Sequence, residues 1–312
     1  MPEITMERPL VSVVVTTKNE EKNIEQCLRS IRLQTYENIE TIVIDNFSTD
    51  KTKEIASRYT DKVYEKGPER SAQRNFGMIN MSSGKYVMFV DADMMLSPSL
   101  IESCVGLMEQ ERLAALHIPE IVLGTGYLSR VRRFERSFYN GTVIDGLRFF
   151  SKQAFIEAGG FDEGMSGPED WDMDKKIKST GRVGLAEEAE GTEHWEMNEV
   201  IIRGGVHPAS CGVAVFHNET EFRLKGYLAK KEYYSQSFDA YIKKWGREDP
   251  DIRKQLGLYY RFLGVFIENG KWKRMIFHPF LVVGMYFLRF MVGIKFLMVK
   301  EKRVIRTCSK EG

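Results

Sequence analysis

The sequence predicts an α/β fold in which helices flank a mixed, mostly parallel sheet, followed by a helical C-terminal region. In the first third of the chain, β-branched runs of strand length alternate with segments whose apolar residues recur at helical spacing. This order is typical of a parallel sheet covered on both faces, because each crossover between parallel strands uses a helix. A chain of 312 residues with 43% hydrophobic residues can form one large domain with a helical appendage.

The first elements follow from the spacing of apolar residues. Ile24, Cys27 and Ile31 recur every three or four residues, so residues 20–33 are expected to form an amphipathic helix. Gly84 marks a turn ahead of an apolar strand. The other elements expected here are strands at 11–16, 39–44 and 85–90 and helices at 51–59 and 71–81.

The remaining pattern is less regular. The pair Gly159–Gly160 ends one expected helix, and Gly167–Pro168 introduces another. We expect two domains, one over residues 1–220 and a helical C-terminal region over 221–312. The elements expected after residue 95 are helices at 99–111, 127–139, 151–158 and 169–179, strands at 116–123, 142–150, 182–186 and 212–216, and largely helical chain over 221–245 and 250–270.

The charge balance and the cysteines exclude some classes of protein. Lys and Arg total 45 and Asp and Glu total 44, so the chain lacks the excess of basic residues that nucleic-acid binding requires. The four cysteines are far apart and form no C-x-x-C pair, which disfavours a zinc site or a disulfide framework. Residues 1–9 are charged and lead directly into a strand, so no secretory signal is expected. These features predict a cytoplasmic protein.

The apolar segment 275–299 raises the question of membrane contact. Its length is near the roughly 20 residues that a spanning helix needs. It follows a basic and aromatic cluster at 271–274, and His278, Arg289 and Lys300 fall close to one helical line. A charged line along an apolar helix suits a helix in the membrane interface. We therefore rank peripheral contact with the cytoplasmic face of a membrane first, a helix packed on the protein second and a membrane span third.

Acidic residues stand where two of the expected parallel strands end. Asp45 follows the second strand, and Asp91 and Asp93 follow the strand over 85–90. Open α/β sheets bind ligands at the carboxyl ends of their strands. Burying two carboxylates is costly unless they are paired or bind a cation, and a divalent cation with oxygen ligands usually also binds phosphate. The glycine-rich dinucleotide motif and the P-loop motif are both absent after the first strand, which disfavours those two nucleotide sites.

An ordered set of motifs over residues 11–234 resembles the family 2 inverting glycosyltransferases, which have the GT-A fold. The resemblance implies a Rossmann-like nucleotide-binding half for the first domain. The motifs are Val13-Val14-Val15-Thr16-Thr17-Lys18-Asn19-Glu20, Asp45-Asn46-Phe47-Ser48-Thr49-Asp50, Arg70 through Arg74-Asn75-x-Gly77, Asp91-Ala92-Asp93, and Gly159-Gly160-Phe161-Asp162 followed by Glu169-Asp170-Trp171-Asp172.

The resemblance implies how a nucleotide-sugar donor would be bound. Thr16 and Glu20 would contact the nucleoside, and Asp45 would bind the base or the ribose, with uridine as the first candidate. Asp45 could instead cap the next helix, although Ser48 or Thr49 can do this too. Arg70 and Arg74 would bind the donor, or else lie on a solvated helix face.

The resemblance also implies a metal site. Asp93 would be the main ligand, Asp91 would lie near both the ribose and the metal, and His217, expected just after a strand, would be a later ligand. Carboxylate and imidazole ligands together with phosphate oxygens suit Mn²⁺, with Mg²⁺ as the alternative. His194 and His207 compete with His217 for this role.

Asp170 is the catalytic base that the resemblance implies. An inverting displacement needs a base that removes the proton of the acceptor hydroxyl on the side opposite the leaving group. An aspartate is ionised at neutral pH, and the first turn of a helix favours its charge. The same helix dipole would favour Glu169 and Asp170 without any catalytic role. Glu169 is expected to support the base, and Trp171 to stack on a sugar or lipid, or to pack in the core.

The leading hypothesis is a metal-dependent inverting glycosyltransferase that moves a sugar from a nucleoside-diphosphate sugar to a glycan or lipid-linked acceptor in cell-surface glycan synthesis. A narrower form makes a polyprenyl phosphate the acceptor. A hypothesis of another class is a non-catalytic protein that binds nucleotide-sugars or glycans. A nucleotidyltransferase ranks third, because no glycine-rich loop for a triphosphate opens the chain.

Overall fold

The computed structural model describes residues 8–186 and 212–308, and the chain falls into two compact units. The first unit comprises residues Met1–Ile121, Asp145–Glu163 and Glu169–Asn218. The second comprises Val122–Ile144, Gly164–Pro168 and Glu219–Gly312. The chain therefore enters the second unit for the last time at residue 219, close to the expected domain boundary at 220. Two shorter segments that we expected in the first domain belong to the second unit.

A seven-stranded sheet forms the centre of the first unit. Its strand order is β3-β2-β1-β4-β8-β6-β9, and only β8 runs antiparallel to its neighbours. The expected mixed, mostly parallel sheet is thus confirmed. The strands are β1 (Val11–Thr17), β2 (Ile39–Asp45), β3 (Val63–Glu65), β4 (Tyr86–Asp91), β6 (Ala115–His117), β8 (Leu147–Ser151) and β9 (Val183–Leu185).

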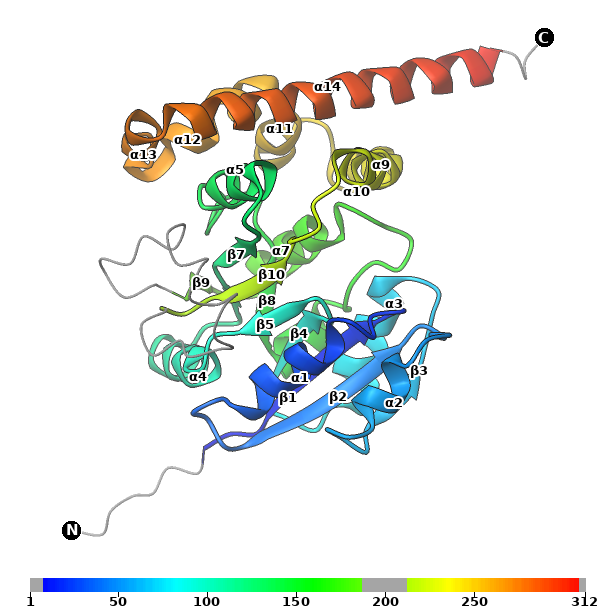
Figure 1. Cartoon of the computed structure of the whole chain (residues 1–312), viewed down its shortest axis with the longest axis vertical. Coiled ribbons are helices and arrows are strands. Elements are labelled where there is room, and N and C mark those ends of the chain that lie inside the picture. Colours follow the sequence, from blue (N-terminus) through cyan, green and yellow to red (C-terminus); the bar gives the residue numbers. More distant parts are fainter. Residues whose placement is uncertain (1–7, 187–211, 309–312) are drawn as a thin grey trace. The chain divides into compact units, whose positions relative to one another are not determined.

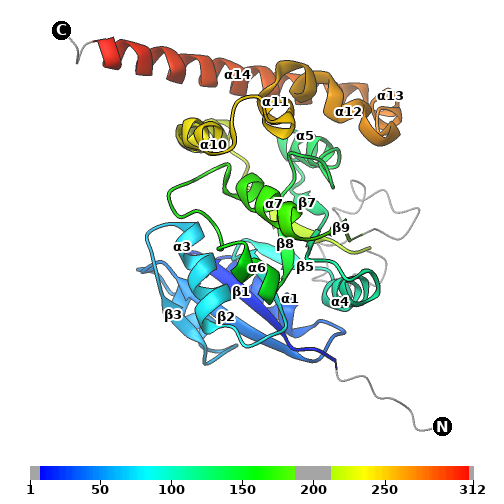
Figure 2. The ribbon, with the colours of Figure 1, turned by 180° about the vertical axis from the view of Figure 1, so that it is seen from behind.

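Helices cover both faces of this sheet because alternate residues of β1 point to opposite sides. Val13 and Val15 pack with α1 and α4, whereas Val14 packs with residues of α6 and α7. Figure 1 shows α1 in front of the sheet, and Figure 2 shows α6 in front of it from behind. The helices of this unit are α1 (Ile24–Arg32), α2 (Thr52–Ala56), α3 (Arg70–Asn75) with the π-helical segment Phe76–Met81, α4 (Leu100–Glu111), α6 (Lys152–Glu157) and α7 (Glu169–Thr180).

The register of the parallel strands brings their carboxyl ends together. Thr17 at the end of β1 lies opposite Asp45 of β2, and Thr16 lies opposite Asp91 of β4. The strand ends that the sequence singled out therefore lie side by side at one edge of the sheet. This edge is where an open α/β sheet binds its ligands.

Several strands differ from expectation. The strand expected over 116–123 is two strands, β6 and β7 (Glu120–Leu123), separated by Ile118 and Pro119. Proline has no N–H to donate to a strand ladder, so it ends the pairing. β5 (Met94–Leu96) was missed because it is only three residues long, and β10 (Val215–Asn218) lies further along the chain than expected. His217 therefore lies within a strand. These strands form a second sheet of order β5-β10-β7.

The second unit is helical, as the pattern beyond residue 220 predicts. Gly284 allows a close approach between two of its helices, since a Cβ there would lie 2.5 Å from Val131 and 2.6 Å from the Tyr127 hydroxyl of α5. The Tyr127 hydroxyl donates a hydrogen bond to the carbonyl of Phe280. The helices are α5 (Tyr127–Arg136), α9 (Leu224–Tyr234), α10 (Phe238–Trp245), α11 (Pro250–Leu256), α12 (Val265–Ile267), α13 (Lys273–Phe277) and α14 (Pro279–Cys308).

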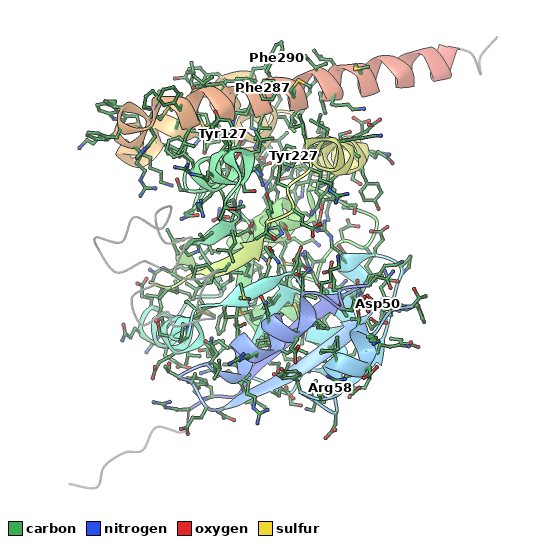
Figure 3. The ribbon with its side chains drawn as sticks, in the orientation of Figure 1. Asp50, Arg58, Tyr127, Tyr227, Phe287 and Phe290 are labelled. Carbon is green, nitrogen blue, oxygen red and sulfur yellow. The ribbon has the colours of Figure 1, made fainter. Side chains whose placement is uncertain are left out.

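One face of α14 is buried and the opposite face is apolar and exposed. The buried face packs on α5 and α9 and contains Leu281, Met285 and Leu288. Figure 3 shows Phe287 and Phe290 on α14, with Tyr127 of α5 on the other side of the helix. The exposed apolar residues of α13 and α14 are Ile276, Phe277, Phe280, Val283, Phe287, Phe290, Ile294, Phe296, Leu297 and Met298.

The expected line of charges along this helix is wrong for Arg289. Its side chain is 7% exposed, and its Nε lies 2.9 Å from Glu135 Oε1. The buried partner on α5 draws the guanidinium inward, which sequence spacing alone does not reveal. Residues Pro279–Met298 are long and apolar enough to cross a membrane, and 28% of this stretch is buried.

Candidate active site

The carboxylate of Asp91 at the end of β4 is bound on two sides. It accepts a hydrogen bond from Thr16 Oγ1 at 2.8 Å, and Arg74 Nη2 lies 3.3 Å from its Oδ1. Burial alone would raise the pKa of Asp91, but the guanidinium groups of Arg74, Arg70 and Arg148 hold it well below its usual range. Asp91 is therefore a stable anion at the edge where the parallel strands end.

Arg74 joins this strand end to the first turn of α7. Its Nη1 lies 3.1 Å from Asp170 Oδ1, while its Nη2 faces Asp91. The guanidinium carbon lies 3.8 Å from the ring centroid of Phe89 and 5.3 Å from that of Phe161. Because Arg74 is only 1% exposed, the alternative that it lies on a solvated helix face is wrong.

The first turn of α7 carries two acids in different surroundings. The side chain of Glu169 is 2% exposed and its Oε1 lies 2.8 Å from Arg70 Nη2. Burial and the neighbouring charge of Asp170 raise the pKa of Glu169. The Asp170 side chain is 36% exposed, so a substrate can reach it. Trp171, the next residue, is partly exposed. The structure thus leaves Asp170 accessible and encloses Glu169.

The residues expected at the nucleoside lie at the ends of β1 and β2. Asp45 is fully buried, and its Oδ2 accepts a hydrogen bond from the backbone N–H of Ser48 at 2.7 Å. Its Oδ1 is buried without a hydrogen-bond partner among the residues described. Burial, together with the charges of Asp93 and other acids, raises the pKa of Glu20, although a hydrogen bond from Asn23 opposes this. Asp45 therefore both orders the loop after β2 and retains a free acceptor.

Asp93 and His217 lie next to each other after β4 and in β10. Asp93 Oδ2 lies 3.3 Å from His217 Nε2, and Asp93 Oδ1 is buried with no hydrogen-bond partner in the described part of the chain. Burial would lower the pKa of His217, but Asp93 and Glu120 raise it to about 10. A cation between the two side chains would replace the proton on Nε2, because imidazole binds metals in its neutral form.

Glu120 of β7 is a site residue that sequence reasoning missed. Its Oε1 lies 3.1 Å from His217 Nδ1, and its Oε2 forms an ion pair with the buried Arg148 of β8. An N–H of His217 directed at this carboxylate would leave Nε2 available as a ligand. An available signal was an acid in the apolar run of residues 116–123, because a buried strand carries an acid only where the charge has a partner.

Asp93 and His217 can supply part of the ligand set of a divalent cation. Over residues 8–186 and 212–308, no three His, Cys, Asp or Glu side chains form a complete metal site. Asp93 and His217 offer one carboxylate and one imidazole, which suits an ion that takes its other ligands from phosphate oxygens and water. Asp91 is engaged by Thr16 and Arg74, so its expected contact with the metal stays a prediction. His194 and His207 lie outside the described residues.

A comparison with protein families finds a match in the first part of the chain. Residues 12–161 match the profile of glycosyl transferase family 2. Over these residues the chain belongs to that family. The matched range contains the strand-end acids Asp45, Asp91 and Asp93, whereas Asp170 and His217 lie beyond it.

Curated bacterial glycosyltransferases match part of the chain. The glycosyltransferase GlyA from Streptococcus pneumoniae is 36% identical over 99 residues, which is 30% of this chain and 14% of that protein. The uncharacterised glycosyltransferase EpsJ from Bacillus subtilis is 32% identical over 155 residues, which is 48% of this chain and 42% of that protein. The chain thus spans less than half the length of each of these relatives.

A solved glycosyltransferase structure confirms the GT-A fold. The mannosyltransferase PcManGT from Pyrobaculum calidifontis, in complex with GDP-Man and Mn²⁺, superimposes with a TM-score of 0.53. The match covers 91% of this chain and 74% of that chain at 19% identity. The expected fold class and the expected glycosyltransferase family are both confirmed.

Proposed function

We propose that this family 2 glycosyltransferase is metal-dependent and inverting, and that it transfers a sugar from a nucleoside-diphosphate sugar to a glycan or lipid-linked acceptor in cell-surface glycan synthesis. The observation that carries the proposal is Arg74, which holds the accessible carboxylate of Asp170 beside the strand-end acid Asp91. The buried Arg74 therefore links the proposed base, Asp170, to the edge of the sheet where the donor would bind.

The donor is bound at the strand ends. Thr16, Glu20 and Asp45 bind the nucleoside, with Arg70 near the donor phosphates. A uridine diphosphate sugar is the first candidate, and guanosine diphosphate is the second, since the related mannosyltransferase was solved with GDP-Man. Asp45 Oδ1 is an acceptor for an N–H of the base or a ribose hydroxyl.

The cation, Mn²⁺ or Mg²⁺, is held by Asp93 and His217, with Asp91 beside it. When bound, it stabilises the charge that develops on the diphosphate leaving group. Glu120 orients His217, and Arg148 compensates the charge of Glu120. Both partners are buried, so His217 is positioned before the donor arrives.

Asp170 removes the proton of the acceptor hydroxyl as that oxygen attacks the sugar carbon. General bases of this kind contribute roughly 10² to 10⁴ in rate. Arg74 keeps the Asp170 carboxylate oriented at the first turn of α7. Trp171 offers a partly exposed ring on which the acceptor can stack.

A donor panel tests this function and separates it from a non-catalytic binding protein. Uridine and guanosine diphosphates should raise the melting temperature only together with Mn²⁺ or Mg²⁺. Hydrolysis or transfer of the sugar from the matching donor should then follow. Nucleotide binding without turnover of any donor would favour the binding protein, and the absence of any nucleotide response would exclude both proposals.

Peripheral contact with the cytoplasmic face of a membrane is the proposed location. The exposed apolar face of α13 and α14 supports it, together with Trp272 and the basic residues around it. Removing residues 271–312 would also remove the buried side of α14, so a surface substitution is the cleaner test. Phe287→Glu with Phe290→Glu should release the protein from anionic vesicles without changing its melting temperature. Retained vesicle binding would contradict this location.

A further inference from the structure

A second group of charged side chains surrounds Glu135 in the helical unit. Arg132 Nη1 lies 2.9 Å from Glu135 Oε2, and Arg289 Nε lies 2.9 Å from its Oε1. The Tyr139 hydroxyl donates to Glu135 at 2.7 Å and accepts from Arg289 at 2.6 Å. All four residues are more than nine-tenths buried. Two guanidinium groups therefore share one carboxylate.

Two further cations, Lys231 and Arg261, add to the positive charge around this group. Neither Lys231 of α9 nor Arg261 has a side-chain hydrogen bond or ion pair in the part of the chain that the structure describes. The Lys231 ammonium lies 5.4 Å from the ring centroid of Tyr227, and the Arg132 guanidinium carbon lies 4.9 Å from the same ring. Lys231 and Arg132 thus meet at one aromatic side chain.

Positive charge exceeds negative charge in this cluster. The cations are Arg132, Lys231, Arg261 and Arg289, with Lys230 beside Lys231. The nearby carboxylates are Glu135 and Glu219, the latter 3.5 Å from Arg132 Nε. Burial and the charges of Arg132 and Arg261 lower the pKa of Lys231 to about 7. Burying uncompensated charge is unfavourable, so the cluster is less stable without an added anion.

The size of the excess points to a phosphate group. With Lys231 protonated, the cations outnumber the two carboxylates by at least two charges. A phosphate monoester carries about −1.5 to −2 charges at neutral pH with three acceptor oxygens, and a phosphate bound here would hold Lys231 in its charged form. Guanidinium and ammonium groups are the side chains that bind such oxygens best. Lys231, Arg261 and Tyr227 are partly exposed, so an anion can reach them without unfolding the helices.

We propose that Arg132, Lys231 and Arg261 form a binding site for the phosphate group of a second ligand, distinct from the nucleotide donor. The phosphate belongs either to a lipid or to a water-soluble molecule, and both present the same oxygens. The site lies within the helical unit and uses none of the strand-end residues. It therefore stands whether or not the proposed transfer reaction is correct.

The test uses the whole chain in EDTA, without nucleotide, with inorganic phosphate and farnesyl phosphate as probes. Calorimetry measures affinity, and thermal unfolding measures stability at constant ionic strength. The wild type should bind phosphate and melt at a higher temperature with it. Lys231→Met should weaken binding at least tenfold and should raise the melting temperature without phosphate, because it removes an unpaired cation. Arg261→Gln should show the same two changes.

Lys225→Met provides the matched control, because Lys225 is an exposed lysine of the same helix. It should bind phosphate as the wild type does. Farnesyl phosphate binding at least tenfold tighter than inorganic phosphate identifies a lipid source, and equal affinities identify a water-soluble one. Undetectable phosphate binding by the wild type, or equal binding by Lys231→Met, overturns the proposal.

Discussion

The strand-end site and the Glu135 cluster are both built from buried arginines, carboxylates and aromatic rings, but their excess charge has opposite sign. At the strand ends, Arg74 forms ion pairs with two carboxylates, those of Asp91 and Asp170. In the helical unit, the carboxylate of Glu135 forms ion pairs with two arginines, Arg132 and Arg289. The first arrangement favours an added cation and the second an added anion. The sign of the uncompensated charge thus indicates the class of ligand.

Asp170→Asn should produce the largest change. If Asp170 is the base, kcat should fall about 10³-fold, because the acceptor hydroxyl keeps its proton. The dissociation constant for nucleoside diphosphate with metal should change little. Asp61→Asn, at an exposed acid of the same unit, is the control and should retain full activity. Loss of nucleotide binding in Asp170→Asn would contradict the assignment of Asp170 as the base. It would indicate instead that Asp170 has a structural role as the ion-pair partner of Arg74.

Arg74→Met should lower the stability of the protein. It removes the cation between Asp91 and Asp170 and should lower the free energy of unfolding by about 3 kcal/mol, measured by urea denaturation. Arg58→Met, at an exposed arginine of a surface ion pair, should change it by less than about 1 kcal/mol. A small effect of Arg74→Met would show that the two carboxylates do not depend on this bridge.

The pH dependence of the stability of Glu135→Gln tests the ion pairs of Glu135 in the helical unit. Burial would raise the pKa of Glu135, but Arg289 and Arg132 lower it to about 2, from an ordinary value of 4.5. Its stabilising effect is therefore complete above pH 4.5 and is lost as the pH falls through 2. Wild type and Glu135→Gln should differ by about 3 kcal/mol at pH 7 and converge toward pH 2. A difference that does not depend on pH would contradict an ionised Glu135.

Glu120→Gln should have the smallest effect of these changes. The variant keeps the shape of the side chain but weakens its hold on His217 Nδ1, so Mn²⁺ affinity should fall about tenfold. The change is measurable by electron paramagnetic resonance of free Mn²⁺. Glu111→Gln, at an exposed acid, is the control and should bind Mn²⁺ normally. Unchanged Mn²⁺ affinity in Glu120→Gln would mean that His217 needs no carboxylate to orient it.

Local patterns were enough to predict most of the fold. β-Branched runs and helical spacing placed β1, β2, β4 and α1 close to their observed positions. Short elements such as β5, and the break at Pro119, were missed because a three-residue strand carries little pattern of its own. The order of acids at strand ends also predicted that Asp45 and Asp91 would lie at one edge, and the register confirms this.

The chain of motifs by itself determined the family, the parallel sheet and the acids at its strand ends, because these depend on residues close together in sequence. Only the tertiary structure decided which charges meet. Arg74 and Asp170 are 96 residues apart in sequence, and His217 and Glu120 are 97 apart. Arg289 and the Tyr139 hydroxyl are 150 apart, which turned an expected membrane-facing charge into a buried one. Pairing of buried charges is set by packing between distant elements, and no local spacing encodes it.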